Sequence, residues 1–183
     1  MGKTERRRLK NWPHIVIIGP PGAGKTNVAK RLGRNIGYPV VIIDKKIVKA
    51  CKVTRLQEVS TRDDFNHIEE RVAIQMLKRL SRPTIIDTGG SIIYSRDAMR
   101  RLDEEGFFVY LTASNEWLIQ RIEKRLDRGI DMHGCKSLSE LLDKRRPEYE
   151  KWADWTIYTD GDHDKIADWL AKRLTMKRLV ARH

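Results

Sequence analysis

The 183-residue sequence contains little cysteine, few aromatic residues and no long apolar run. Its two cysteines, Cys51 and Cys135, lack metal-ligand spacing and are too few for the disulfide framework of a small secreted domain, which indicates a reducing compartment. The longest apolar runs, IVII and VVII, fall far short of the roughly 20 residues that cross a membrane, and no signal-peptide core follows the charged start. We therefore expect a soluble cytoplasmic protein without membrane association.

Acidic residues are outnumbered by basic ones, which gives a formal net charge of +12 and favours anionic partners. Much of this charge lies at the two ends, in KTERRRLK and KRLTMKRLVARH. We interpret residues 1–13 and 175–183 as basic, solvated tails. The alternative, a nucleic-acid-binding arm, lacks interleaved aromatic residues and a recognisable module, so we expect no nucleic-acid partner.

Between the tails, residues 14–174 have the alternating pattern of a single α/β domain. Short β-branched runs predict five strands, at His14–Ile18, Val40–Ile43, Thr84–Asp87, Phe107–Leu111 and Trp155–Thr159. Helical spacing predicts six helices, at Lys25–Ile36, Arg62–Leu80, Arg96–Glu105, Asn115–Asp127, Leu138–Trp152 and Lys165–Leu174, with further helical turns between Lys45 and Ser60. The pattern predicts a three-layer αβα fold around a central five-stranded parallel sheet.

The first predicted strand leads into a phosphate-binding loop, Gly19-x-x-x-x-Gly24-Lys25-Thr26, which opens a helix. Glycines let successive backbone N–H groups point at one phosphate, and the helix N-terminus adds a favourable dipole. Lys25 is expected to reach the β- and γ-phosphates and Thr26 to ligate Mg²⁺. A chance glycine-rich turn is disfavoured because strand, loop and helix agree. The loop therefore predicts a nucleoside triphosphate, ATP, with Mg²⁺ as cofactor.

The loop identifies the donor but not the acceptor, and no NKxD-type guanine-reading segment is present. Asp44 follows the second strand, IIDTGGS ends the third, WLIQRIEKRLDRG follows the fourth, and KRRPEY precedes the fifth. In this order the chain resembles the shikimate kinase family of nucleoside-monophosphate-kinase-like P-loop kinases, from His14 to about Leu174. The resemblance implies an ATP-dependent transfer to the 3-hydroxyl of shikimate in aromatic amino acid biosynthesis, and a lid at about residues 128–137.

The resemblance also implies roles for individual residues. Asp44 matches the aspartate that bonds the acceptor hydroxyl, Gly89 and Gly90 match the glycine turn that touches the acceptor, and Arg145 matches the arginine that binds its carboxylate. The residues expected to act in catalysis are Lys25, Asp44 and Arg128, the last as the lid arginine. Those expected to bind ATP are Gly22, Ala23, Gly24, Lys25, Thr26, Asn27, Arg121 and Arg128.

One departure from the family pattern concerns the metal. The first acidic position of the family, two residues before Asp44, is Ile42 here. Asp87 closes the apolar run TII, the setting in which an aspartate of P-loop proteins faces the water shell of the metal. We interpret Asp87, with Thr26, as a metal-site residue. The alternative is a turn or helix-capping carboxylate.

The other departures concern the acceptor. The acceptor-binding arginine of the family's FRxxE motif is Asn66 in FNHIEE, with Glu69 retained, and the third glycine of the turn is Ser91. Asn66 is thus the expected acceptor-binding position without its cation. Arg62, four residues earlier on the same predicted helix face, is long enough to substitute, although we favour an ordinary surface arginine.

Three functions remain open at this point. The first is a shikimate kinase, acting on ATP and shikimate or a similar hydroxy acid as a monomer. The second is a kinase of the same fold with another acceptor, such as a nucleoside monophosphate, which the loss of an arginine at Asn66 permits. The third is a nucleotide-binding module without acceptor turnover.

Overall fold

The computed structural model describes residues 14–124, 129–159 and 162–176. The predicted basic tails lie almost entirely outside these ranges. Arg128, the expected lid arginine, also lies outside the described residues. Within them, no helix combines the length and apolar character needed to cross a membrane.

Five strands form one parallel sheet, as predicted. They are β1 (His14–Ile18), β2 (Val40–Ile42), β3 (Ile85–Asp87), β4 (Gly106–Thr112) and β5 (Trp155–Tyr158), in the order β2-β3-β1-β4-β5. Central β1 pairs with β3 and with β4, and Ile17 lies opposite both Asp87 and Val109. Because all strands run the same way, their carboxyl ends lie at one edge of the sheet, where open α/β folds bind ligands.

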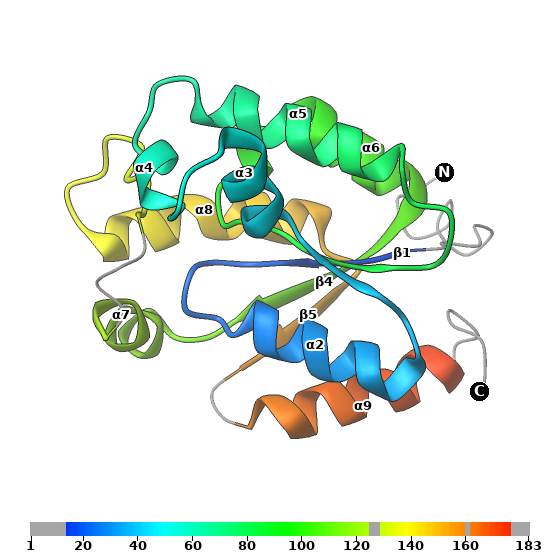
Figure 1. Ribbon diagram of the computed structural model, residues 1–183. Helices are drawn as coiled ribbons and strands as arrows, with labels where there is room; N and C mark the ends of the chain where they lie inside the picture. The colour runs from blue at the N-terminus through cyan, green and yellow to red at the C-terminus, as the bar shows by residue number, and fades with distance from the viewer. Residues whose placement is uncertain (1–13, 125–128, 160–161, 177–183) are drawn as a thin grey trace.

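Helices cover both faces of the sheet (Figure 1). They are α2 (Lys25–Ile36), α3 (Ile43–Cys51), α4 (Gln57–Ser60), α5 (Phe65–Leu77), α6 (Arg96–Glu105), α7 (Asn115–Glu123), α8 (Leu138–Trp152) and α9 (His163–Met176), with a 3-10 turn, η1 (Ile92–Tyr94). In Figure 1, α2 and α9 lie below the sheet, α3, α5 and α6 lie above it, and α7 lies beside the end that carries the loop after β1. The predicted three-layer αβα architecture is confirmed.

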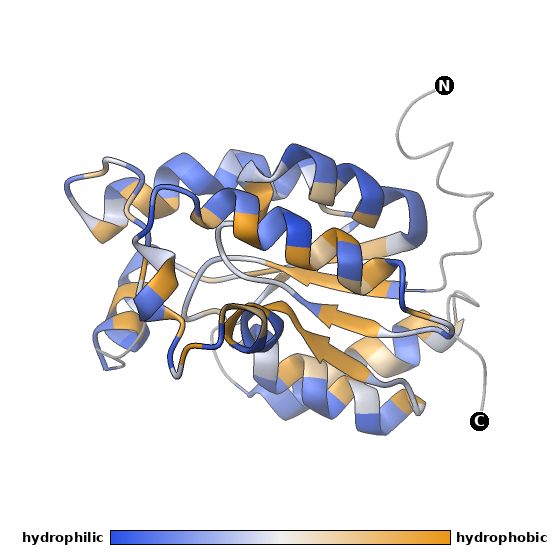
Figure 2. Ribbon diagram, turned by 45° about the horizontal axis from the view of Figure 1, so that its top comes forward, coloured by the Kyte–Doolittle hydropathy of each residue, from blue (hydrophilic) through white to orange (hydrophobic). Residues whose placement is uncertain are grey.

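Strand residues alternate between two apolar cores, one on each face. Val16 and Ile18 of β1 belong to the core beneath α3, α5 and α6, whereas Ile15 and Ile17 belong to the core against α2 and α9. Figure 2 shows the strands as hydrophobic ribbons between helices whose outer faces are hydrophilic. Burial on both faces explains why the strands read as continuous apolar runs.

Helix boundaries differ from the predictions where local chemistry intervenes. The helix expected over Arg62–Leu80 begins at Phe65 and ends at Leu77. Arg62 binds Asp64, the residue that precedes the helix, and after Leu77 the chain tightens into turns in which the N–H groups of Arg79 and Leu80 bond the carbonyls three residues earlier, each at 3.0 Å. The turns expected between Lys45 and Ser60 are α3 and the short α4.

The apolar core predicts a contrast between two aromatic strand residues. Phe108 of β4 is fully buried, whereas Tyr158 of β5 is 67% exposed. Replacement of Phe108 by alanine should lower the free energy of unfolding by about 3–5 kcal/mol, because it leaves a cavity. Tyr158→Ala, the control, should change it by about 0.5 kcal/mol or less. Denaturant titration measures both values; equal losses would contradict this view of the sheet.

Candidate active site

The loop between β1 and α2 wraps closely around the end of the sheet. Gly24, which precedes α2, has a φ of 84°, and any β-carbon there would clash with the imidazole of His163 at the start of α9. Both facts restrict the position to glycine. At the neighbouring loop residue, the Thr159 hydroxyl, directly after β5, donates to the carbonyl of Ala23 at 3.0 Å. The loop is therefore held by elements far away in the sequence.

Lys25 is folded over the same loop. Its Nζ donates to the carbonyl oxygens of Gly19 at 2.7 Å and Pro20 at 3.0 Å, and its side chain is 9% exposed. The ammonium group thus lies within the concave side of the loop. From there it can interact with a phosphate bound by the loop N–H groups.

Thr26 and Asp87 meet in the described structure. The Thr26 hydroxyl donates to Asp87 Oδ2 at 2.6 Å, and β2–β3 pairing sets Asp87 directly opposite Ile42. Asp87 therefore lies one strand over from the position where the family pattern has its first aspartate. In the described ranges no group of three or more His, Cys, Asp or Glu residues is arranged to hold a metal. Two oxygen ligands still fit Mg²⁺, which keeps several waters and takes the rest from phosphates.

A polar cavity lies beside the loop. Its walls are formed by Gly22, Gly24, Lys25, Thr26, Asn27, Asp44, Asp87, Thr88, Arg121 and Ile122. These include every residue expected to bind ATP except buried Ala23 and Arg128, which is outside the described residues. The Arg121 guanidinium lies 4.4 Å from the centroid of the Trp117 ring on α7. This contact orients the arginine along the cavity wall.

A second cavity, of about 190 Å³, adjoins the first. It is lined by Pro21, Lys25, Asp44, Leu56, Ser60, Phe65, Gly89, Gly90, Ser91, Gly129, Ile130, Asp131 and Arg145. The volume is many times the roughly 10–15 Å³ that one water molecule requires by the same measure, so a small organic acid can enter. Lys25 and Asp44 line both cavities and thus lie at their junction.

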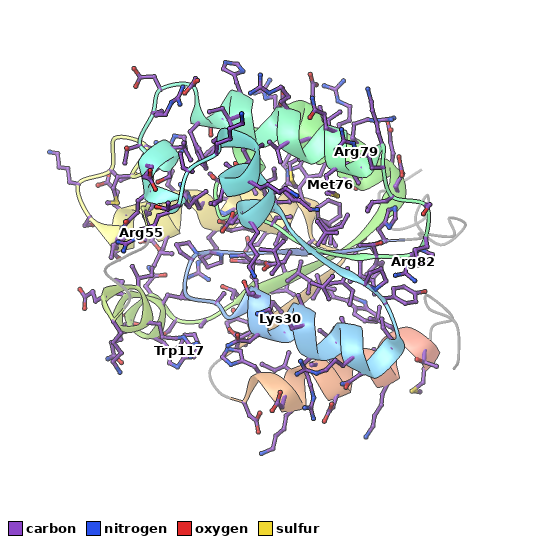
Figure 3. All side chains as sticks on the ribbon, viewed as in Figure 1. Lys30, Arg55, Met76, Arg79, Arg82 and Trp117 are labelled. Atoms are coloured by element: carbon purple, nitrogen blue, oxygen red, sulfur yellow. The ribbon has the colours of Figure 1, made fainter. Side chains whose placement is uncertain are left out.

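The second cavity lies toward the end of the fold that carries α4 and α7. Figure 3 shows Arg55 beside α4 and Trp117 on α7 at this end, whereas Arg79 and Arg82 lie near the opposite end.

Arg145 projects from α8 into the second cavity although it is only 2% exposed. Its Nη2 donates to the carbonyl of Asp131 at 2.9 Å, and its guanidinium lies 5.5 Å from the centroid of the Tyr94 ring. Its Nε has no hydrogen-bond partner among the described residues. A buried guanidinium with an unused donor is suited to an anionic ligand.

Glu69 lies beneath the glycine turn and is fully buried. Ser91 Oγ donates to Glu69 Oε2 at 2.9 Å, and a β-carbon on Gly89 would clash with Glu69 Oε1 and lie 2.9 Å from Asp44 Oδ1. Burial, and to a lesser degree the nearby Asp44, raise the pKa of Glu69 to about 8, although Ser91, Arg145 and Lys25 oppose the shift. Glu69 is therefore a neutral acid at pH 7 in this structure.

Asn66 and Arg62 do not supply a second cation here. Asn66 lies on α5 outside the lining of the second cavity, where its backbone carbonyl accepts from Ser95 Oγ at 3.3 Å. Arg62 is 54% exposed and bonds Asp64 through two nitrogens, at 2.9 and 2.8 Å. The geometry agrees with Arg62 as a surface arginine. Among the described residues, Arg145 is thus the one guanidinium that lines this cavity.

Two anchoring contacts were not predicted. The Tyr149 hydroxyl donates to the carbonyl of Gly90 at 2.5 Å, and Thr159 holds Ala23 as described above. Tyr149 belongs to the KRRPEY segment, so its neighbourhood was recognisable but its role was not. Thr159 follows β5 without any local motif, and only the tertiary structure brings it to the loop.

The sequence was also compared with a family model and with known proteins. A sequence model described as shikimate kinase matches residues 21–175. A shikimate kinase of Thermodesulfovibrio yellowstonii is 32% identical over 154 residues, covering 81% of this chain and 86% of the relative. Shikimate kinase 1 of Salmonella newport is 30% identical over 158 residues, covering 84% and 90%.

Solved structures share the fold. The shikimate kinase from Acinetobacter baumannii in complex with shikimate has a TM-score of 0.78 at 23% identity, covering 96% of this chain and 99% of that one. The shikimate kinase from Aquifex aeolicus has a TM-score of 0.71 at 22% identity, covering 91% and 98%.

The raised pKa of Glu69 predicts a pH dependence of stability. Because the pKa is about 8 in the folded chain and near 4.5 when the group is unperturbed, the folded state holds the proton more tightly. The free energy of unfolding should therefore fall as the pH rises from about 5 to about 8. Glu69→Gln should remove most of this slope, whereas Glu123→Gln, at an exposed position, should keep it. Denaturant titrations between pH 5 and 9 test this; an unchanged slope in Glu69→Gln would refute it.

Proposed function

The chain belongs to the shikimate kinase family, and we propose that it transfers the γ-phosphoryl group of ATP to a hydroxyl of shikimate. The observation that supports this most directly is the junction of the two cavities. Lys25 and Asp44 line both the cavity beside the phosphate-binding loop and the cavity that contains Arg145. A phosphoryl group transferred from the cavity beside the loop to the cavity that contains Arg145 would pass between the ammonium group of Lys25 and the carboxylate of Asp44.

In this proposal Lys25 and the loop N–H groups bind the phosphates and stabilise the charge of the transferred group. Thr26 and Asp87 hold Mg²⁺, which neutralises phosphate charge and orients the phosphates when bound. Arg128, outside the described residues, is our candidate for the lid arginine that closes over the transferred phosphoryl. Gly22, Ala23, Gly24, Asn27 and Arg121 complete the ATP site.

Asp44 orients the acceptor. Its carboxylate accepts a hydrogen bond from the reacting hydroxyl and takes the proton as the new P–O bond forms and the bond from the γ-phosphorus to the leaving ADP oxygen breaks. Arg145 binds the acceptor carboxylate, and Gly89 and Gly90 allow the acceptor to approach the turn closely. Neutral Glu69 limits the negative charge next to Asp44 and the acceptor.

A second candidate is a kinase of the same fold with a different hydroxy acid as acceptor. It is favoured by the second cavity, which has one guanidinium in its described lining, where the family pattern predicts an additional arginine at Asn66. We also propose a monomer in the cytoplasm, which agrees with two cysteines that are not joined in a disulfide.

The proposed function is tested by a coupled assay with ATP and shikimate. Wild-type protein should produce ADP in a shikimate-dependent way, and Lys25→Met should lower kcat at least about a hundredfold, because the variant loses a charge that stabilises the transition state. Lys30→Met, an exposed lysine on the same helix, is the matched control and should retain activity. Wild-type protein that is inert with shikimate but active on another hydroxy acid would favour the second candidate.

The metal assignment is tested by titration with Mg²⁺. Asp87→Asn should raise the Mg²⁺ concentration for half-maximal rate about tenfold or more, because it removes a charged oxygen from the site. Ile42→Asp should partly restore the wild-type value in the Asp87→Asn background, since Ile42 and Asp87 are register partners. Identical titrations for wild type and Asp87→Asn would return Asp87 to a structural role.

The acceptor assignment predicts opposite effects at two arginine positions. Asn66→Arg should lower KM for shikimate about tenfold, because it adds a charge-assisted contact of roughly 1.5–3 kcal/mol. Arg145→Ala should nearly eliminate activity. Arg62→Ala is the control, since Arg62 binds Asp64 at the surface, and should leave KM within about twofold. A large rise of KM in Arg62→Ala would show that this arginine reaches the acceptor after all.

A further inference from the structure

Among the buried serine and threonine side chains of the described residues, one hydroxyl has no hydrogen-bond partner. Six fully buried serine and threonine side chains have such partners: Thr84, Thr88, Ser91, Ser95, Thr112 and Thr159. The seventh, Ser60, is 2% exposed, and its Oγ has no partner in the described protein. Because an unpaired buried hydroxyl is costly, the exception requires an explanation.

The local structure does not provide a partner. Ser60 is the last residue of α4, and a helical serine or threonine commonly bonds a carbonyl one turn earlier. Thr175 in α9 does so, donating to the carbonyl of Ala171 at 2.9 Å. The carbonyl one turn before Ser60, that of Leu56, accepts the backbone N–H of Ser60 at 2.9 Å but does not accept its hydroxyl. The hydroxyl is left for another group.

Ser60 lines the cavity that also contains Asp44 and Arg145. The other side chains that α4 and its flanks bring to this wall, Leu56 and Phe65, are apolar. Ser60 is therefore the polar point of an otherwise apolar wall. A molecule bound in the cavity with a hydroxyl facing this wall could form a hydrogen bond with Ser60 Oγ.

The segment after residue 128 closes the cavity over Ser60. A β-carbon on Gly129 would clash with Ser60 Oγ and lie 2.7 Å from the Cα of Gln57. The main chain at Gly129 thus lies directly on α4, which separates the Ser60 hydroxyl from solvent. A hydrogen bond formed there is shielded from competing water, which raises its effect on specificity.

We propose that Ser60 is a specificity-determining residue that hydrogen-bonds a hydroxyl of the acceptor other than the one phosphorylated. The inference rests on the proposed function, which assigns the reacting hydroxyl to Asp44 and the carboxylate to Arg145. These two contacts bind the reacting hydroxyl and the carboxylate of the acceptor. Its remaining hydroxyls face the other walls of the cavity. Ser60 can donate or accept, so it suits a hydroxyl in either orientation.

The test compares shikimate with two analogues that each lack one of its non-phosphorylated hydroxyls. Ser60→Ala should raise KM for shikimate about two- to tenfold with little change in kcat. For the analogue that lacks the hydroxyl bound by Ser60, wild type and Ser60→Ala should have the same KM. Thr61→Ala, at the adjacent exposed residue, is the matched control and should behave as wild type with all three acceptors.

Thermal unfolding without ligand separates this role from a structural one. Because the hydroxyl has no protein partner, Ser60→Ala should leave Tm unchanged or raise it. An unchanged KM, an equal rise with all three acceptors, or a lowered Tm that accounts for the activity loss would each overturn the assignment of Ser60. Wild-type protein without turnover of shikimate would instead overturn the proposed function, and the inference about Ser60 with it.

Discussion

The parallel pairing of β1 with both β3 and β4 is the interaction on which the site depends. It aligns the carboxyl ends of three buried strands, so that the loop after β1, Asp87 at the end of β3 and Thr112 at the end of β4 lie at the same edge of the sheet. Side chains alternate along a strand, so a shift of β3 by a single residue would turn Asp87 toward the other face and away from Thr26. The apolar cores on both faces prevent such a shift. Burial of the strands thus determines where the charged groups meet.

Features with a local cause could be predicted from the sequence. The strand, glycine-rich loop and helix around Lys25 occupy consecutive residues, and the five apolar runs are long enough to identify the sheet. Contacts between distant segments could not be predicted in the same way. The hydrogen bonds of Thr159 to Ala23 and of Tyr149 to Gly90 join segments 136 and 59 residues apart, and no composition rule pairs them. Helix ends were also missed: the chain forms a turn before α5, in which the N–H of Phe65 bonds the carbonyl of Arg62 at 3.0 Å, and the helix begins only at Phe65.

The two departures from the family pattern near the acceptor, Asn66 and Ser91, both affect the charge of Glu69. An arginine at Asn66 would lie one helical turn before Glu69 and could neutralise it. Here that cation is absent, and Ser91, where the pattern has glycine, donates a hydrogen bond to Glu69. Burial raises the pKa of Glu69, and a hydroxyl opposes this shift less than a nearby guanidinium would, so the carboxyl retains its proton. Two substitutions that look unrelated in the sequence therefore act on the same carboxyl group.

The register between β2 and β3 has a consequence for how such sites diverge. Ile42 and Asp87 are 45 positions apart along the chain but are nearest neighbours across two strands. An acidic side chain can therefore migrate from one strand to the next during evolution and still serve the same point in space. A sequence motif that requires an acidic residue on the first of these strands would classify such a protein as lacking the metal ligand. A motif that includes the register partner on the neighbouring strand would show that the ligand has moved to that strand.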